Sequence, residues 1–226
     1  MWNKIQRIYV GDHYQVYPKW KPWANTIAYY KLESDANDYS WNSKNMSNSW
    51  VTFNEYSWVN CWYFNGSWYL SRSWSLFTWS SDFTVSAWIK PDWNWVSGKG
   101  RVIYTNGTAS WTRIFTMWLK PISTWNLMVW WWSNDRDTSY IPAVNSWTHC
   151  VMAHSWWTIK VYCNWSLIYT GSVSFNISNN ISSIWRQVNG SDYFYWYLSN
   201  IIIENNQRTA QEVADYYNQT KWNYGL

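Results

Sequence analysis

Glycine is scarce in this chain, whose 226 residues include 8 glycines and 26 tryptophans. That is about half the average glycine content of proteins. Cysteine is scarce too: Cys61, Cys150 and Cys163 contain no C-x-x-C pair, which argues against a disulfide framework and a structural zinc site. No apolar run reaches the roughly 18 residues that a membrane-spanning helix needs, so we expect no membrane insertion.

Charge and the N-terminus exclude two further classes. The formal net charge is +4, and the lysines and arginines are scattered rather than gathered in a basic stripe. A nucleic-acid partner is therefore not expected. Residues 1–18 lack an apolar core segment, so we expect no secretory signal peptide.

Short segments with alternating polarity recur along the chain and predict an all-β fold. In Phe83–Lys90 the side chains of Phe83, Val85, Ala87 and Ile89 fall on one face of a strand. Further strands are expected at Asn25–Leu32, Val59–Phe64, Arg101–Tyr104, Arg113–Leu119, Asn126–Trp131, His149–Ala153, Thr158–Cys163, Ser166–Thr170 and Tyr193–Ile203. Many short strands separated by turns indicate a two-sheet antiparallel sandwich, with Ile159 and Val161 also in the core.

One short helix is expected near the C-terminus. Thr209 and Glu212 form a capping box, and apolar residues recur at helical spacing as far as Tyr217, so the helix should cover 209–220. The N-terminal residues 1–24 differ in character and predict an arm or attachment segment, in which Ile5–Val10 and Gln15–Tyr17 form either a small hairpin or an extended arm. The sandwich domain should then occupy residues 25–226.

Several segments carry a recognisable pattern in a fixed order. They are Ile27–Leu32, Asp38–Ser40, Tyr63–Ser67, Phe83–Pro91, Trp147–Val151, Lys160–Asn164 and Tyr197–Asn206, followed by the capped helix. Together they resemble the LamG-like jelly roll of the concanavalin A-like lectin and glucanase superfamily over about residues 25–221. The resemblance implies a jelly-roll sandwich and a carbohydrate or surface ligand.

Many tryptophans stand where a turn calls for glycine. Members of the resembled family have glycine after the turn that here reads Asp38–Ser40, and after Asn164, whereas this chain has Trp41 and Trp165. A bulky residue at positive φ is an outlier. One explanation is that UGA encodes glycine in the source and was translated as tryptophan; the alternative is a tryptophan-rich glycan-binding surface. Turn tryptophans of this kind stand at Trp41, Trp50, Trp93, Trp95, Trp125, Trp156, Trp165 and Trp222, whereas Trp88 and Trp147 match family tryptophans.

No catalytic constellation is visible. Glycoside hydrolysis needs two carboxyl groups flanking the scissile bond, and none of Glu33, Glu55, Glu204 and Glu212 lies in the Glu-x-Asp-x-x-Glu cluster of the related glucanases. The three histidines pair with no nucleophile at a recognisable spacing, and His149 is expected to pack in a strand.

Two oxygen-rich loops are the candidate calcium and ligand sites. Asp92 with Asn94 forms one, and Asp135 and Asp137 with Asn134 the other; a solvated loop is the alternative for both. Trp131 and Tyr140 could stack on a sugar beside Asn134, or serve as core or turn residues. Ser199 and Asn200 replace acidic residues of many family members, which argues against a metal site there.

These features favour a non-catalytic binding module for a glycan or a surface protein. Ile8–Gly11 and Gln15–Pro18 resemble short leader segments of phage virion proteins. A phage virion or tail-associated adhesion protein is therefore the specific hypothesis, located extracellularly or on a virion surface. Residues 1–24 would contact the virion or another copy of the chain. A glycan hydrolase of the same superfamily and purely structural virion decoration are the alternatives.

The register of one hairpin places two cysteines together. If Trp156 and Trp157 form a two-residue loop, Ser155 pairs with Thr158 and Cys150 faces Cys163 as a non-hydrogen-bonded pair. The two side chains should be neighbours in the core, and the register leaves their oxidation state open.

Overall fold

The computed structural model describes most of the chain. The described residues are 6–10, 13–17, 23–56, 59–65, 68–77, 82–91, 101–108, 114–120, 126–130, 135–178, 181–187 and 195–226. The candidates Trp131, Asn134, Asp92 and Asn94 lie outside them, as do the turn tryptophans Trp93, Trp95 and Trp125.

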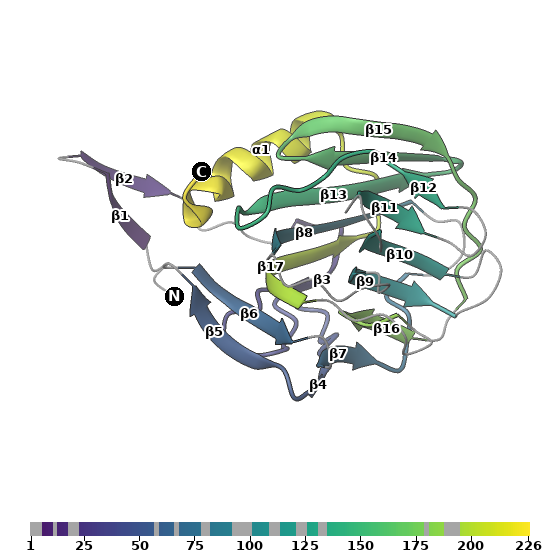
Figure 1. Ribbon diagram of the computed structural model, residues 1–226, viewed down its shortest axis with the longest axis horizontal. Coiled ribbons are helices and arrows are strands. Elements are labelled where there is room, and N and C mark those ends of the chain that lie inside the picture. The colour runs from purple at the N-terminus through teal and green to yellow at the C-terminus, as the bar shows by residue number, and fades with distance from the viewer. Residues whose placement is uncertain are drawn as a thin grey trace.

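Two antiparallel sheets form a sandwich (Figure 1). One follows the order β12 (Arg136–Asp137), β11 (Leu127–Trp130), β10 (Ile114–Leu119), β9 (Arg101–Gly107), β16 (Ile181–Ile184), β7 (Tyr69–Arg72) and β4 (Ser47–Ser49). The other follows β15 (Ser166–Ser172), β14 (Thr158–Cys163), β13 (Thr148–Ser155), β8 (Phe83–Pro91), β17 (Tyr195–Glu204), β6 (Val59–Asn65) and β5 (Thr52–Tyr56), with β3 (Thr26–Tyr30) also paired to β17. The predicted all-β jelly-roll sandwich is confirmed.

The main core lies between the two sheets and follows the predicted alternation. Val85, Ala87 and Ile89 of β8 belong to it together with Ile159 and Val161 of β14, and all five are fully buried. Phe83 is buried there as well. Burial of each valine, isoleucine or phenylalanine side chain contributes about 1.5–3 kcal/mol. Such burial is the dominant stabilising effect in a sandwich of this kind.

The opposite face of β8 is buried too, because a helix covers it. The helix α1 (Ala210–Thr220) packs on the outer face of the second sheet and continues as a 3-10 turn, η1 (Lys221–Tyr224) (Figure 1). Trp88 packs there beneath Tyr217 and Tyr224, with ring centroids 5.7 and 3.9 Å away. Thr209 caps the helix and forms the predicted capping box with Glu212. Among the described residues, no helix is both long enough and apolar enough to span a membrane.

The N-terminal segment forms a hairpin, which is one of the two arrangements expected from the sequence. Its strands β1 (Gln6–Val10) and β2 (His13–Tyr17) pair with each other in a separate two-stranded sheet. Figure 1 shows this hairpin projecting away from the sandwich.

The hairpin formed by β13 and β14 has the predicted register. Ser155 pairs with Thr158, and Cys150 pairs with Cys163. Both cysteines are buried in the main core as free thiols.

Turn tryptophans and core tryptophans separate in the structure as the sequence predicts. Trp41, Trp50, Trp156 and Trp165 have positive φ values of 77°, 69°, 54° and 70°, and all four side chains are exposed, as is that of Trp222. Trp88 is buried within β8, and Trp147 is buried immediately before β13 rather than inside a strand. Trp185 combines a φ of 82° with full burial, a combination that the sequence did not lead us to expect.

Candidate functional site

A polar pocket of about 450 Å³ opens beside the start of β3. Two walls come from the chain around Asn25 and from the loop that contains Asn42, and Asn205 closes it from the end of β17. Its lining consists of amide, hydroxyl, indole and ammonium groups: Asn25, Thr26, Ser40, Asn42, Asn205, Trp23, Trp41 and Lys44, with Ala24 and Ile27. No Asp, Glu or His stands among the described residues that line it.

Asp38 organises the loop that forms one wall. Its carboxylate accepts hydrogen bonds from the backbone amides of Tyr29, Ser40 and Lys44 at 2.9, 2.8 and 2.9 Å, and from the Ser40 hydroxyl at 2.9 Å. Short side chains with an oxygen acceptor commonly fix turns in this manner. Asp38 therefore has a structural role, which holds Lys44 at the rim of the pocket.

The polar groups of the pocket fall into two sets. Asn42 donates through Nδ2 to the carbonyl oxygens of Thr26 and Ile27 at 2.8 and 3.1 Å, so its amide ties the loop to β3. In the described part of the chain, no hydrogen bond involves the side chains of Asn25, Lys44 or Asn205. These three side chains are therefore available to a ligand.

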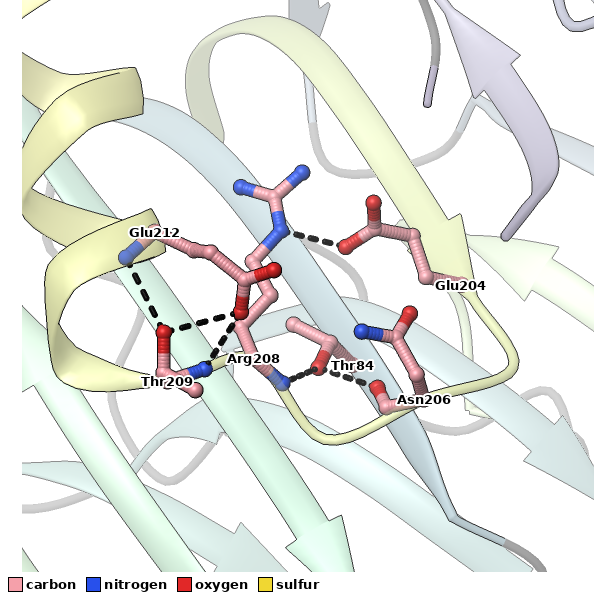
Figure 2. A network of polar contacts seen from close by, with 6 residues as sticks. All are labelled: Thr84, Glu204, Asn206, Arg208, Thr209 and Glu212. Atoms are coloured by element: carbon pink, nitrogen blue, oxygen red, sulfur yellow. Dashed lines mark hydrogen bonds and ion pairs between the residues drawn. The ribbon is translucent and has the colours of Figure 1, made fainter. Parts of the chain in front are cut away.

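A buried ion pair between Arg208 and Glu204, drawn in Figure 2, supports the Trp23 side of the pocket. The Arg208 guanidinium lies 3.8 Å from the centre of the Trp23 ring, which lines the pocket. Arg208 donates through Nε to Glu204, and neither side chain is exposed. Trp23 is thus held by a cation–π contact to a cation that is itself anchored in the fold.

The same network fixes the segment between β17 and α1 to the sheet (Figure 2). The Thr84 hydroxyl donates to the Asn206 carbonyl at 2.7 Å and accepts from the Arg208 amide at 2.9 Å. The Asn205 amide donates to the Asn25 carbonyl at 3.0 Å. The backbone bond between Asn205 and Asn25 therefore brings two residues that are far apart in sequence together at the pocket.

Asp137 was expected in a loop, but it lies on the short strand β12, where it pairs with β11, and its surroundings differ from those of the pocket. Partial burial alone would raise the pKa of Asp137. Hydrogen bonds from Ser139, Asn126 and Lys120 outweigh this effect and bring the pKa below its ordinary value. Asn126 and the Ser139 amide donate to one carboxylate oxygen at 2.7 and 2.8 Å, and Lys120 lies 3.3 Å from the other. A cation that bound Asp137 would have to displace these donors, so calcium at Asp135 and Asp137 stays a prediction.

The neighbours of Asp137 do not form a ligand set in the described residues. Asp135 lies at the surface, where partial desolvation of its carboxyl group by neighbouring protein raises its pKa against the opposing charges of Lys120 and Arg136. Tyr140 packs partly against the main core, and burial raises the pKa of its hydroxyl. No group of three His, Cys, Asp or Glu side chains suited to a metal ion occurs within the described part of the chain.

Known proteins share this fold. The fourth domain of AbnA, a GH43 extracellular arabinanase from Geobacillus stearothermophilus solved with arabinotriose, is 16% identical, with a TM-score of 0.71 over 84% of this chain and 97% of that domain. The binding domain of Paraclostridial Mosquitocidal Protein 1 is 18% identical, with a TM-score of 0.64 over 86% of this chain and 52% of its own length. A structure of botulinum neurotoxin type C, a toxin whose cell entry depends on interaction with two ganglioside molecules, is 17% identical. Its TM-score is 0.63 over 86% of this chain and 51% of that chain.

These likenesses establish the architecture, and the chain spans about half the length of the toxin binding domains it matches. A comparison with curated protein sequences finds no match. The sequence model of one family, described as the concanavalin A-like lectin/glucanases superfamily, matches residues 64–214, which is more than half of the chain. With its two-sheet sandwich and its terminal helix, this chain belongs to the concanavalin A-like lectin/glucanases superfamily.

Proposed function

We propose that this chain is a non-catalytic binding module whose pocket takes a short glycan. The pocket beside β3 carries the proposal, because Asn25, Lys44 and Asn205 present hydrogen-bonding groups next to the indole of Trp23. Sugar hydroxyls need such donors and acceptors, and the apolar face of a sugar ring packs on an aromatic side chain. The arabinotriose bound in the arabinanase domain and the gangliosides of the type C toxin support this ligand class.

Hydrolysis of the bound glycan is not expected. A glycosidase needs two carboxyl groups about 5–9.5 Å apart on either side of the bond, and the pocket has none among its described lining residues. Two carboxylates elsewhere, Glu204 and Asp137, already form ion pairs with Arg208 and Lys120.

Replacing Lys44 by alanine should weaken glycan binding by roughly 10- to 100-fold, because a hydrogen bond from a charged group contributes about 1.5–3 kcal/mol. Binding would be measured by calorimetry with a neutral or acidic oligosaccharide selected on a glycan array. Lys160→Ala is the matched control, because Lys160 lies on β14 and does not line the pocket. Equal losses in both variants would contradict the pocket assignment.

The array itself separates the alternatives. If the chain bound no glycan, two alternatives would remain: binding to a surface protein, or structural decoration of a virion. A botulinum neurotoxin binding domain of similar fold, solved in complex with synaptotagmin II, is an example of the first. Turnover of the oligosaccharide would make the chain an enzyme. A loss of binding on chelation would instead indicate calcium, with Asp135 and Asp137 as the first ligands to test.

We further propose that the module acts outside a cell or on a phage virion, with residues 1–24 as its attachment segment. The hairpin of β1 and β2 supports this role, because its strands pair only with each other within the described residues. The same segment could join copies of the chain.

We also infer that most of the turn tryptophans are glycine in the natural protein. Left-handed backbone costs a non-glycine residue about 1–2 kcal/mol, and an indole exposed on the surface recovers little of that cost through packing. Four tryptophans combine both features at separate turns: Trp41, Trp50, Trp156 and Trp165. Glycine adopts such a φ without a steric penalty.

The coding sequence tests this inference directly. We expect UGA at the codons for Trp41, Trp50, Trp156 and Trp165, and UGG at those for Trp88 and Trp147. The intact mass of the protein purified from its source should be lower than the mass of the written sequence. The difference for each recoded position should be that between a tryptophan and a glycine residue. UGG at every position would support a tryptophan-rich glycan-binding surface instead.

A further inference from the structure

Two thiols face each other across adjacent strands inside the main core. Cys150 of β13 and Cys163 of β14 are register partners, and their Sγ atoms lie 3.8 Å apart. The next pair along the hairpin is hydrogen-bonded, since the Asn164 amide donates to the His149 carbonyl at 2.9 Å. Pairs alternate along an antiparallel ladder, so Cys150 and Cys163 form a non-hydrogen-bonded pair.

This position suits a disulfide bond. The Cα atoms of a non-hydrogen-bonded pair are about 4.5 Å apart, which lies within the range of about 4.4–6.8 Å that disulfides span. The Sγ atoms need only close from their present contact to a bond of about 2.05 Å. Cys61 lies in a different cluster, beneath the helix with Trp88, and is not part of the pair.

We propose that Cys150 and Cys163 form a disulfide bond that closes the hairpin of β13 and β14 when the chain folds in oxidising surroundings. A small-molecule disulfide, such as oxidised glutathione, is the oxidant. The thiolate of one cysteine attacks it and releases one small thiol, and the other cysteine then displaces the second. The two cysteines lose two protons and two electrons, and the oxidant becomes two thiols.

The timing follows from burial. Burial and the neighbouring Cys150 thiol raise the pKa of the Cys163 thiol, so the folded chain contains little of the reactive thiolate. Both side chains are also shielded from a dissolved oxidant. The bond should therefore form while β14 is unpaired, and the folded, reduced chain should oxidise far more slowly than the refolding chain.

The test refolds the full chain from urea in mixed oxidised and reduced glutathione, and in parallel with a reductant alone. The folded monomer is isolated and unfolded in urea without reductant, its free thiols are alkylated, and the cysteines are mapped by peptide mass spectrometry. We expect alkylation at Cys61 alone and one peptide that links Cys150 to Cys163. The Tm of this form should exceed that of the reduced form by roughly 5–10 °C.

Two variants control the result. Cys61→Ala should keep the linked peptide and the increase in Tm, whereas Cys163→Ala should lose both. Three alkylated cysteines in folded protein refolded with oxidised glutathione, or a bond to Cys61, would overturn the proposal. If the chain does not refold from urea, the same mapping on chain secreted into an oxidising compartment decides in the same way.

Discussion

Replacing Arg208 by methionine should lower the free energy of unfolding by about 3–5 kcal/mol at neutral pH, because it leaves the buried charge of Glu204 uncompensated. Neither side chain of this pair is exposed, and Arg208 is the sole cationic partner of Glu204 among the described residues. Methionine keeps part of the packing against the rings of Trp23 and Tyr216, whose centres lie 3.8 and 5.1 Å from the guanidinium. Most of the loss should therefore come from the charge rather than from packing. A domain is stable by about 5–15 kcal/mol, so the effect is a large fraction of the total.

The cost should depend on pH with a definite sign. Burial raises the pKa of Glu204, and the charge of Arg208 opposes this rise. Without Arg208 the folded pKa increases further above the unfolded value near 4.5. A raised folded pKa gives stability that is present in full below the unfolded pKa and is lost as pH rises through the folded pKa. Stability of Arg208→Met should therefore fall more steeply above pH 4.5 than that of the unmodified chain.

Urea unfolding at several pH values measures both effects. The double variant Glu204→Gln with Arg208→Met should regain most of the lost stability and lose the extra pH dependence. Lys120→Met is the matched control, because the ion pair of Lys120 with Asp137 is partly exposed and should contribute less than about 1 kcal/mol. A loss for Arg208→Met no larger than that of the control would contradict the buried pair as a major stabilising contact.

The fold could be predicted because its central strands carry strong hydrophobic patterns. The division of the side chains of β8 between its two faces and the register of β13 with β14 follow from local sequence, and the structure confirms both, although both faces of β8 are buried. The strands missed by sequence analysis are short or polar, such as β4 with the sequence SNS and β16 with the sequence ISSI. Although β16 pairs with both β9 and β7, its two serines obscure the alternation of a buried strand.

The pocket could not be predicted because its parts are distant in sequence. Asn25 and Asn205 come together through the pairing of β3 with β17, and no local pattern signals that contact. One signal was present: the Asp38–Ser40 turn of the resembled family, which organises a wall of the pocket. Carboxylates directed the prediction to Asp137 instead, where internal donors already occupy the oxygen atoms.

Trp88→Gly and Trp41→Gly make the same chemical change and should have opposite effects. Trp88 is fully buried and stacks against His149 and Tyr224, with ring centroids 5.0 and 3.9 Å away. Removal of such a side chain leaves a cavity and costs about 3–5 kcal/mol. Glycine inside a strand adds about 0.5–1 kcal/mol to that loss.

Trp41 lies at the other extreme. Its side chain is 91% exposed, and its φ is 77°. Glycine there removes a backbone penalty of about 1–2 kcal/mol and adds an entropic cost of about 0.5–1 kcal/mol, so the chain should gain roughly 0.5–1 kcal/mol. The same reasoning applies to Trp50, whose φ is 69° on an exposed turn.

Urea unfolding of the single variants and of Trp41→Gly with Trp50→Gly provides the measurement. The two turn variants should raise the unfolding midpoint and combine additively, since they occupy separate turns. Trp88→Gly should lower the midpoint sharply. Trp41→Ala is the control for strain, because alanine removes the indole but retains the Cβ that left-handed backbone disfavours. If Trp41→Ala stabilises as much as Trp41→Gly, the benefit comes from loss of the exposed indole, and the argument from backbone conformation fails at this turn.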